Sequence, residues 1–252
     1  MDHLLAQVLD IAREAGEAIL RIYAQDFEVD IKADNSPVTA ADNAANQVIL
    51  QGLNALQAPI PILSEEGGEG FTGPDADGRY WLVDPLDGTK EFVKRNDEFT
   101  VNIALIENGK PVLGVVLAPV FNVAYIAANG IGAFRVDENG RHAIHVAGKP
   151  DKGSHWRVMG SRYHANPHLE HWLKQLGPHE TRLVGSSLKF GIIAEGSADV
   201  YPRLGPTSLW DTAAAQAVVE QAGGRVVTMA GTPLSYANPN ETLNPEFVAW
   251  GH

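Results

Sequence analysis

The segment WLVDPLDGT at residues 81–89 delivers two carboxylates, Asp84 and Asp87, at the end of an apolar stretch. Because proline cannot continue the hydrogen bonds of a sheet ladder, Pro85 is expected to end the strand and fix a turn. Hard oxygen ligands at a strand end suit Mg²⁺, which usually keeps several waters and shares substrate phosphate oxygens. A lone Asp-Gly pair commonly does no more than reverse the chain. Two Asp, Pro, Gly and Thr together favour a metal site over a plain turn.

Gly88 and Thr89 add a candidate phosphate-binding turn to this segment. Glycine lets a backbone approach a ligand closely. Thr89 opens a predicted helical turn through residues 90–94, whose free N–H groups can hold a phosphate.

A second acidic position lies in the segment WDTAAAQAVVEQAGG at residues 210–224. The pattern predicts a helix over 212–222 that is apolar almost all round, with Asp211 at its N-cap and two glycines ending it. Asp211 therefore has two interpretations, a metal ligand or a simple helix cap.

Two weaker acidic positions complete the set. Glu65 follows a predicted strand at residues 60–63, where adjacent acids are often only the start of a solvated loop. Asp42 stands three residues after Thr39, in the spacing of a capping box, and can be explained as the capping partner alone.

The elements that must position these residues fall into two predicted halves, 1–148 and 149–252. The first is expected to be an α+β unit with an antiparallel sheet, since Asn-Gly pairs separate several strand-like runs. Its predicted helices cover residues 4–23 and a run from the capping box at 39–42 to about residue 56. Its predicted strands cover 27–31, 60–63, 80–83, 99–106, 112–117, 123–127, 133–136 and 143–146.

The second half alternates strand-like and helix-like segments, which indicates an α/β arrangement. Its predicted strands cover residues 156–159, 182–184, 199–201, 225–229 and 247–250, and its predicted helices cover 168–176, 188–195 and 212–222.

Composition narrows the function classes. The chain of 252 residues carries a formal charge of −12 and no cysteine. A thiolate metal site, a disulfide and a cysteine nucleophile are therefore excluded, and binding to a nucleic acid polymer is disfavoured. We find no signal peptide and no transmembrane segment, so a cytoplasmic location is expected.

The two long motifs at residues 81–89 and 210–224, with the Glu pair at 65–66, resemble the signature motifs of the inositol monophosphatase superfamily. The resemblance spans nearly the whole chain. The segments DPLDGTKEF at 84–92 and GSSLKFGIIAEGSADVYPR at 185–203 are most similar to 3′(2′),5′-bisphosphate nucleotidases of the bacterial CysQ type. Inositol monophosphatases usually read DGTTNF where this chain reads DGTKEF.

The resemblance implies a layered αβαβα sandwich of the inositol monophosphatase and fructose-bisphosphatase type. It also implies roles for individual residues. The metal ligands would be Glu65, Asp84, Asp87, Asp211 and the backbone carbonyl of Leu86. Catalysis would depend on Asp42, Thr89 and Glu65, and the N–H groups of Gly88 and Thr89 would bind the scissile phosphate. The substrate would be contacted by Ser161, His164, Ser186, Lys189 and Arg203. Tyr163 departs from the serine that the family pattern has beside Ser161 and His164.

The activity implied is Mg²⁺-dependent hydrolysis, with two or three ions, of 3′-phosphoadenosine 5′-phosphate to AMP and phosphate, which clears a by-product of sulfate assimilation. The resemblance implies inhibition by Li⁺, and the looser coordination of Ca²⁺ predicts inhibition by that ion. The alternatives are an inositol monophosphatase or related sugar-phosphate phosphatase, and a non-catalytic metal or phosphometabolite binder. A homodimer is compatible with the sequence. The resemblance further implies peripheral attachment to the cytoplasmic face of the inner membrane, but no segment of the sequence explains such attachment.

Overall fold

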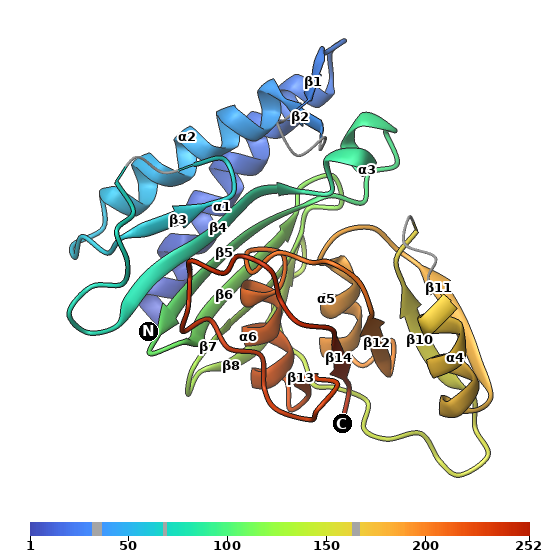
Figure 1. Cartoon of the computed structure of the whole chain (residues 1–252). Coiled ribbons are helices and arrows are strands. Elements are labelled where there is room, and N and C mark those ends of the chain that lie inside the picture. Colours follow the sequence, from blue (N-terminus) through green and yellow to red (C-terminus); the bar gives the residue numbers. More distant parts are fainter. Residues whose placement is uncertain (32–36, 68–69, 163–166) are drawn as a thin grey trace.

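Helices and sheets alternate in layers in the computed structural model, which describes residues 1–31, 37–67, 70–162 and 167–252. Helices α1 and α2 cover the outer face of a seven-stranded sheet, and helices α5 and α6 lie between that sheet and a five-stranded one (Figure 1). Helix α4 packs on the far side of the second sheet. This order of layers confirms the αβαβα sandwich.

The first layers belong to the N-terminal part of the chain. The seven-stranded sheet has the order β3-β4-β5-β6-β7-β8-β9, with β3 parallel to β4 and every other neighbouring pair antiparallel. The elements are α1 (Asp2–Tyr23), β1 (Val29–Ile31), β2 (Pro37–Thr39), α2 (Ala40–Asn54), β3 (Ile62–Ser64), β4 (Arg79–Asp87), α3 (Thr89–Val93), β5 (Thr100–Glu107), β6 (Lys110–Ala118), β7 (Val123–Ala128), β8 (Gly132–Asp137) and β9 (Gly140–Ala143).

The later layers come from the rest of the chain. Strands β11, β10 and β12 run parallel, and β14 pairs antiparallel with both β12 and β13. The elements are β10 (Trp156–Gly160), α4 (Pro167–Leu176), β11 (His179–Leu183), α5 (Leu188–Ala194), β12 (Val200–Arg203), α6 (Ala213–Gln221), β13 (Arg225–Thr228) and β14 (Phe247–Trp250).

Strand β4 shows how the sheet separates two hydrophobic cores. Trp81 and Val83 point into the core beneath α1 and α2, whereas Tyr80 and Leu82 point into the core shared with α5 and α6. Successive side chains of a strand alternate between faces, so a strand covered on both sides is apolar throughout. β4 therefore carries its acidic residues into a firmly held central position.

Helix α6 approaches the sheet closely at Gly114. A Cβ added to this glycine of β6 would lie 2.1 Å from the carbonyl oxygen of Ala214. Only glycine lets the two backbones come so near. The contact fixes the start of α6 against the first sheet.

Strand β4 does not end at Pro85, as the sequence analysis expected, but continues to Asp87. Asp84 pairs with Asn102 and Asp87 with Thr100, so two residues of β4 lie opposite one of β5. This is a β-bulge, where the unpaired residue tolerates the missing N–H of proline. The bulge sets the directions of both carboxylates.

The strand predicted at 143–146 was also wrong. Strand β9 already begins at Gly140, because the turn after β8 returns the chain into the sheet at once. The N–H of Ile144 still donates to the carbonyl of Ala133 in β8, and the chain then leaves the sheet, so that the N–H of Val146 donates to the carbonyl of Ala222 at the end of α6.

The predicted boundary at residues 148 and 149 falls between the last strand of one sheet and the first strand of the other. One hydrophobic core joins residues from both sides of it, so the division into two domains stays a prediction. Within the described ranges, no helix is long and apolar enough to cross a membrane. The homodimer and the cytoplasmic location also stay predictions.

Candidate active site

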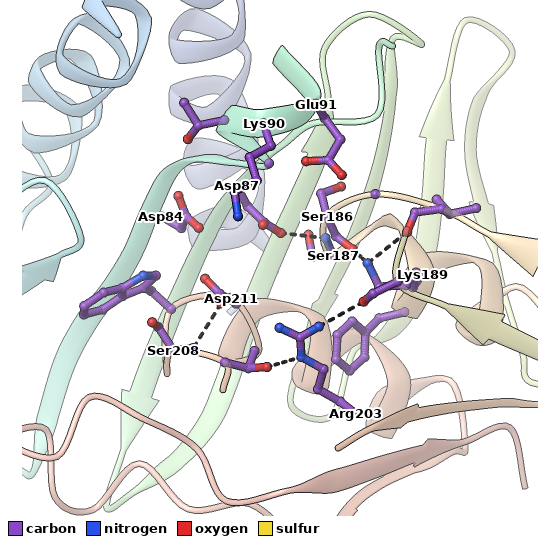
Figure 2. Close-up of a pocket in the computed structure, with 18 of the residues that line it drawn as sticks. Asp84, Asp87, Lys90, Glu91, Ser186, Ser187, Lys189, Arg203, Ser208 and Asp211 are labelled. Carbon is purple, nitrogen blue, oxygen red and sulfur yellow. Dashed lines mark hydrogen bonds between the residues drawn. The ribbon is translucent and has the colours of Figure 1, made fainter. Parts of the chain in front are cut away.

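A cavity of about 490 Å³ opens where the ends of β3 and β4 face the loops before α5 and α6 (Figure 2). It collects nearly all the residues singled out in the sequence. Those that line it are Glu65, Asp84, Leu86, Asp87, Gly88, Thr89, Ser161, Ser186, Lys189, Arg203 and Asp211. His164 lies outside the described residues.

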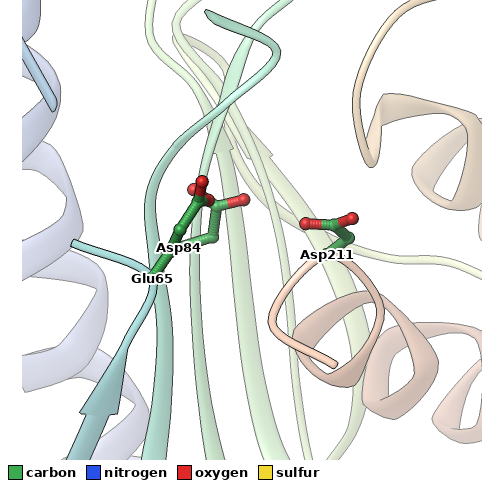
Figure 3. Close-up of side chains that lie close together, drawn as sticks. All are labelled: Glu65, Asp84 and Asp211. Carbon is green, nitrogen blue, oxygen red and sulfur yellow. The ribbon is translucent and has the colours of Figure 1, made fainter. Parts of the chain in front are cut away.

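Three of the acidic residues form a group that can hold a cation. Glu65 follows β3, Asp84 lies in β4, and Asp211 precedes α6 on the opposite side of the cavity (Figure 3). One carboxylate oxygen of each lies within 4.8 Å of the others. Residues 146 positions apart in sequence, Glu65 and Asp211, thus meet only through the tertiary fold.

Asp211 is not the helix cap that the sequence analysis considered. Helix α6 begins at Ala213 with Thr212 at its N-cap, and a turn occupies Leu209–Thr212 before it. The carboxylate of Asp211 instead accepts the N–H of Ser208 at 3.0 Å. The side chain therefore does not serve the helix, and it lies close enough to Asp84 for the two side chains to share a hydrogen bond.

The electrostatics of this group favour a bound cation. Burial and then the charges of Glu65, Asp87 and Asp211 raise the pKa of Asp84 well above its ordinary value. Burial and the charges of Asp87 and Glu65 raise the pKa of Asp211 to about 8. Buried carboxylates that repel each other destabilise the fold unless a proton or a cation neutralises them.

Asp87 is held by a network that the sequence analysis missed. Its Oδ2 accepts the N–H of Ser187 at 2.6 Å, and Thr100 Oγ1 and Asn102 Nδ2 each approach the same oxygen at 3.4 Å. The hydroxyl of Ser187 is in turn bound to Asn102 and Thr100, both at 2.7 Å. The signal available in sequence was a pair of polar residues, Thr100 and Asn102, on one face of an apolar strand.

Burial raises the pKa of Asp87, while nearby Lys189 and the hydrogen bonds to its carboxylate act in the opposite direction. Asp87 is not among the three residues whose oxygens lie within 4.8 Å of one another. It stands beside that group in the cavity wall, so a metal role for Asp87 stays a prediction.

The carboxylate of Asp42 divides its two oxygens between two tasks. Oδ2 accepts the N–H and the hydroxyl of Thr39, both at 2.8 Å, which completes the predicted capping box of α2. Oδ1 accepts the hydroxyl of Thr89 at 3.2 Å. Burial raises the pKa of Asp42, and the hydrogen bonds from both threonines oppose that shift. Asp42 can therefore cap helix α2 and bind Thr89 at the active site at the same time.

Gly88 turns the chain from β4 into α3. Its φ of 95° lies in the left-handed region, and an added Cβ would lie 3.3 Å from the carboxylate of Glu91 and from the carbonyl of Glu98. The conformation and the space both require glycine here. The turn presents Thr89 to the cavity.

Two buried cations line the other side of the cavity. Lys189 is 4 % exposed and donates to the carbonyl oxygens of Val184 and Ser186. Its ring contact with Tyr201, at 5.2 Å from the centroid, covers the side chain further. Neither its burial nor its contacts fit a solvated surface lysine.

Arg203 is 9 % exposed at the end of β12. Its guanidinium donates to Ser161 Oγ at 3.1 Å, to the carbonyl of Pro206 at 2.6 Å and to Thr207 Oγ1. A guanidinium has five N–H donors, so these contacts leave part of its fork for a ligand.

Glu98, in the loop between α3 and β5, holds the loop that carries Ser186. Glu98 accepts the N–H of Gly185 and a guanidinium N–H of Arg162, both at 2.7 Å. Ser186 itself has a φ of 50°, a strained value for a residue with a side chain. The sequence analysis did not identify Glu98, because it belongs to no motif with recognisable spacing.

Comparison with known proteins agrees with this geometry. The model of the inositol monophosphatase family matches residues 1–249. A protein of Escherichia coli O157:H7 named 3′(2′),5′-bisphosphate nucleotidase CysQ is 53 % identical over 97 % of this chain and 98 % of its own.

Solved structures show the same relationship. The crystal structure of CysQ from Bacteroides thetaiotaomicron superimposes with a TM-score of 0.84 at 39 % identity, covering 99 % of this chain and 97 % of the other. An inositol monophosphatase from Anabaena gives 0.79 at 26 % identity, covering 99 % and 91 %. The match therefore extends over nearly the whole chain, and the chain belongs to the inositol monophosphatase family.

Proposed function

We propose that this protein is a 3′(2′),5′-bisphosphate nucleotidase that hydrolyses 3′-phosphoadenosine 5′-phosphate to AMP and inorganic phosphate. One observation carries the proposal: a single cavity has carboxylates on one side and two buried cations on the other. A substrate with two phosphates fits this division, since one phosphate is cleaved and the other needs its own counter-charge. The high identity to CysQ relatives supports the same activity.

The donor set fits magnesium. Carboxylate oxygens are hard ligands, and a group of buried acids with raised pKa values is stabilised by a divalent cation. Glu65, Asp84, Asp87, Asp211 and the carbonyl of Leu86 would hold it. Magnesium, when bound, supplies the positive charge that neutralises phosphoryl oxygens and assists departure of the leaving oxygen.

The chain's own residues would prepare the attacking water. Thr89 donates its hydroxyl hydrogen to Asp42, which leaves the lone pairs of Thr89 Oγ1 to accept a hydrogen bond from water. Asp42 is buried and can take a proton through this contact. The N–H groups of Gly88 and Thr89 would orient the scissile phosphate. No phosphoenzyme is required, because these acids serve as ligands or proton acceptors.

The remote 5′-phosphate would lie against Lys189 and Arg203. Arg203 offers a planar fork that matches phosphate oxygens, and Ser161 and Ser186 lie beside these cations. The sulfated form of the nucleotide carries the same 3′-phosphate and is a second candidate substrate. We also propose inhibition by Li⁺ and by Ca²⁺, since Ca²⁺ takes longer and looser coordination than Mg²⁺.

Phosphate release over a panel of substrates tests the function. The panel contains 3′-phosphoadenosine 5′-phosphate, adenosine 3′-phosphate, inositol 1-phosphate and fructose 1,6-bisphosphate, each with Mg²⁺ and after chelation. We expect the highest kcat/KM for the nucleotide bisphosphate and no turnover without metal. Preference for inositol 1-phosphate or for the sugar bisphosphate would identify a sugar-phosphate phosphatase, and binding without turnover would identify a metal or phosphometabolite binder.

A further inference from the structure

The side chain of Asn244 binds the turn that carries Asp211. Asn244 lies in the loop between β13 and β14 and is 9 % exposed. Its Nδ2 donates to the carbonyl of Ser208 at 2.7 Å, to Thr212 Oγ1 at 3.0 Å and to the carbonyl of Thr207 at 3.2 Å. Because a side-chain amide has two N–H hydrogens, these three acceptors occupy its donors fully.

The backbone brings this side chain to the turn. Two backbone hydrogen bonds, both 2.8 Å long, join residues 207–209 to residues 242–244. Ser208 and Leu243 form an antiparallel bridge at the centre of this contact. The backbone contacts do not depend on the side chain of Asn244, so a substitution there should leave the two segments paired.

The peptide group between Thr207 and Ser208 links Asn244 to Asp211. Its oxygen accepts both the backbone N–H of Asn244, at 2.8 Å, and the side-chain Nδ2. Its N–H donates to the carboxylate of Asp211 at 3.0 Å (Figure 2). Hydrogen bonds that meet at one peptide group polarise it and strengthen one another. Asn244 therefore holds the peptide group that in turn holds the carboxylate.

Asn244 also fixes the chain on the other side of Asp211. Thr212, whose hydroxyl accepts a hydrogen bond from Nδ2, directly follows Asp211 and is fully buried. The turn is thus held before and after the acidic residue. Glu65 and Asp84 come from the first half of the chain, so the position of this turn decides whether the three carboxylates lie within 4.8 Å of one another.

The oxygen of the same amide indicates what the protein needs from Asn244. Among the described residues, its buried Oδ1 has no hydrogen-bond partner. A buried oxygen without a partner costs free energy. The benefit of this residue therefore lies in the two hydrogens that its side chain donates, and both go to the turn around Asp211.

We propose that Asn244 is a positioning residue for the metal site: by holding the turn on both sides of Asp211, it keeps that carboxylate where a divalent cation can join it to the other acids. The inference rests on the proposed function, in which Asp211 is a ligand of Mg²⁺. Asn244 is not among the residues that line the cavity. Its loss should therefore weaken metal binding and spare the chemical step once the metal is saturating.

The test compares thermal melts of Asn244→Ala and the wild type over a series of Mg²⁺ concentrations. Because only the folded state holds the ion, the rise in Tm reports metal affinity without any substrate. We expect the variant to need about tenfold more Mg²⁺ for the same rise in Tm, while kcat at saturating Mg²⁺ stays within about twofold of the wild type.

The matched control is Tyr236→Phe. It removes a fully buried hydroxyl that binds Thr212 Oγ1 at 3.0 Å and Gln216 Oε1 at 2.8 Å, and it leaves the contacts of residues 207 and 208 in place. Its Tm in chelator should fall, with the same response to Mg²⁺ as the wild type. A second variant, Asn244→Leu, fills a similar space without a donor and should repeat the result of Asn244→Ala, also where the alanine variant does not fold.

A lower Tm in chelator with an unchanged response to Mg²⁺ in the Asn244 variants would overturn the inference, since Asn244 would then only stabilise the fold. An equal loss of metal affinity in Tyr236→Phe would also overturn it, because the effect would then belong to the core beneath the turn. Neither result affects the nucleotidase proposal, which fails instead if the wild type gains no stability from Mg²⁺ or does not hydrolyse the nucleotide.

Discussion

At the scale of single residues, the most informative side chain is Asp42. One of its oxygens caps α2 through Thr39, and the other holds the hydroxyl of Thr89 at the cavity. A helix cap and a proton acceptor thus share one carboxylate. Because the cap fixes the orientation of the Asp42 carboxylate, its other oxygen is held in position to accept the hydroxyl hydrogen of Thr89.

Replacing Thr89 should separate the chemical step from metal binding. We expect Thr89→Ala to lower kcat about a hundredfold or more, because it removes the group that links Asp42 to the attacking water. The Mg²⁺ concentration for half-maximal activity should change little. Steady-state kinetics over a range of Mg²⁺ concentrations measures both quantities.

Thr39→Ala is the matched control, since it removes the other hydroxyl bound to Asp42. It should cost about 1 kcal/mol of helix capping and lower Tm by a few degrees, with a much smaller effect on kcat. If Thr89→Ala instead weakened metal affinity and kept full turnover at saturating metal, Thr89 would have to be assigned to the metal site.

The raised pKa of Asp211 predicts how the metal-free protein responds to pH. The folded state keeps its proton up to a pKa of about 8, far above the unfolded value of about 3.9, so the stabilisation is full below pH 4. Stability is lost as pH rises from 4 to 8. In chelator, Tm should therefore fall between pH 6 and pH 8.

Asp211→Asn serves as the reference for this measurement. Asparagine can still accept the N–H of Ser208, but it carries no charge, so its Tm should fall less steeply with pH than that of the wild type. The variant should also lose the rise in Tm that Mg²⁺ gives the wild type, together with activity. Parallel Tm profiles for both proteins in chelator would show that Asp211 is already ionised in the folded state.

At the scale of elements, the site depends on how closely α6 lies on the first sheet. Asp211 reaches the acidic group because α6 packs against β6 at Gly114. The β-bulge between Asp84 and Asp87 in β4 likewise positions these two carboxylates at the cavity. The close approach at Gly114 and the bulge in β4 both act by setting the position of the backbone, and neither alters the chemistry of the ligand side chains.

Gly114→Ala should therefore disturb the metal-binding site although residue 114 lies outside it. Its Cβ would lie 2.1 Å from the carbonyl of Ala214, so α6 must move. We expect a loss of about 2–3 kcal/mol, a Tm lower by roughly 5 °C or more, and weaker Mg²⁺ binding. Calorimetry with and without Mg²⁺ would measure these effects.

Gly130→Asn is the control for a glycine in a turn. Its φ of 75° suits asparagine, and no heavy atom lies within 4 Å of an added Cβ. Tm and metal affinity should both stay near the wild-type values. A Gly114→Ala protein with unchanged metal affinity would mean that α6 can shift without moving Asp211.

At the scale of the whole molecule, the cavity joins opposite charges from two halves of the chain. Glu65, Asp84 and Asp87 come from the first half, and the second half supplies Lys189 and Arg203 together with the acidic Asp211. The protein as a whole carries a charge of −12. The two buried cations thus form a local positive region in an acidic protein, which suits recognition of a small anion.

Arg203→Lys tests whether this cation recognises the remote phosphate. Lysine keeps the charge but cannot bind Ser161, Thr207 and Pro206 and still offer a planar fork. We expect kcat/KM for 3′-phosphoadenosine 5′-phosphate to fall about tenfold or more, and that for adenosine 3′-phosphate to fall much less.

The control for Arg203→Lys is Arg157→Lys, which alters an arginine paired with Asp199 outside the cavity lining. It should leave the ratio of the two substrates unchanged. Equal losses on both substrates in Arg203→Lys would assign Arg203 to holding the loop rather than the 5′-phosphate.

The sequence by itself determined the residue types of the site and most of the elements. Local signals sufficed for the acidic motif at 81–89, for the capping box of Thr39 and Asp42, and for helices such as α1. These features depend on hydrogen bonds and periodicities within a few residues, which the order of residues encodes directly.

Only the tertiary structure decided how these residues meet. The sequence could not show that Pro85 lies in a bulge, that Asp211 leaves the helix cap to Thr212, or that Ser187 holds Asp87 from 100 residues away. Each depends on the register between strands or on contacts between layers, and both are set by packing of the whole core. Only the family resemblance assigned Lys189 and Arg203 to the substrate, because the residues taken alone could equally be surface charges. Burial between the layers gives both side chains their place in the cavity.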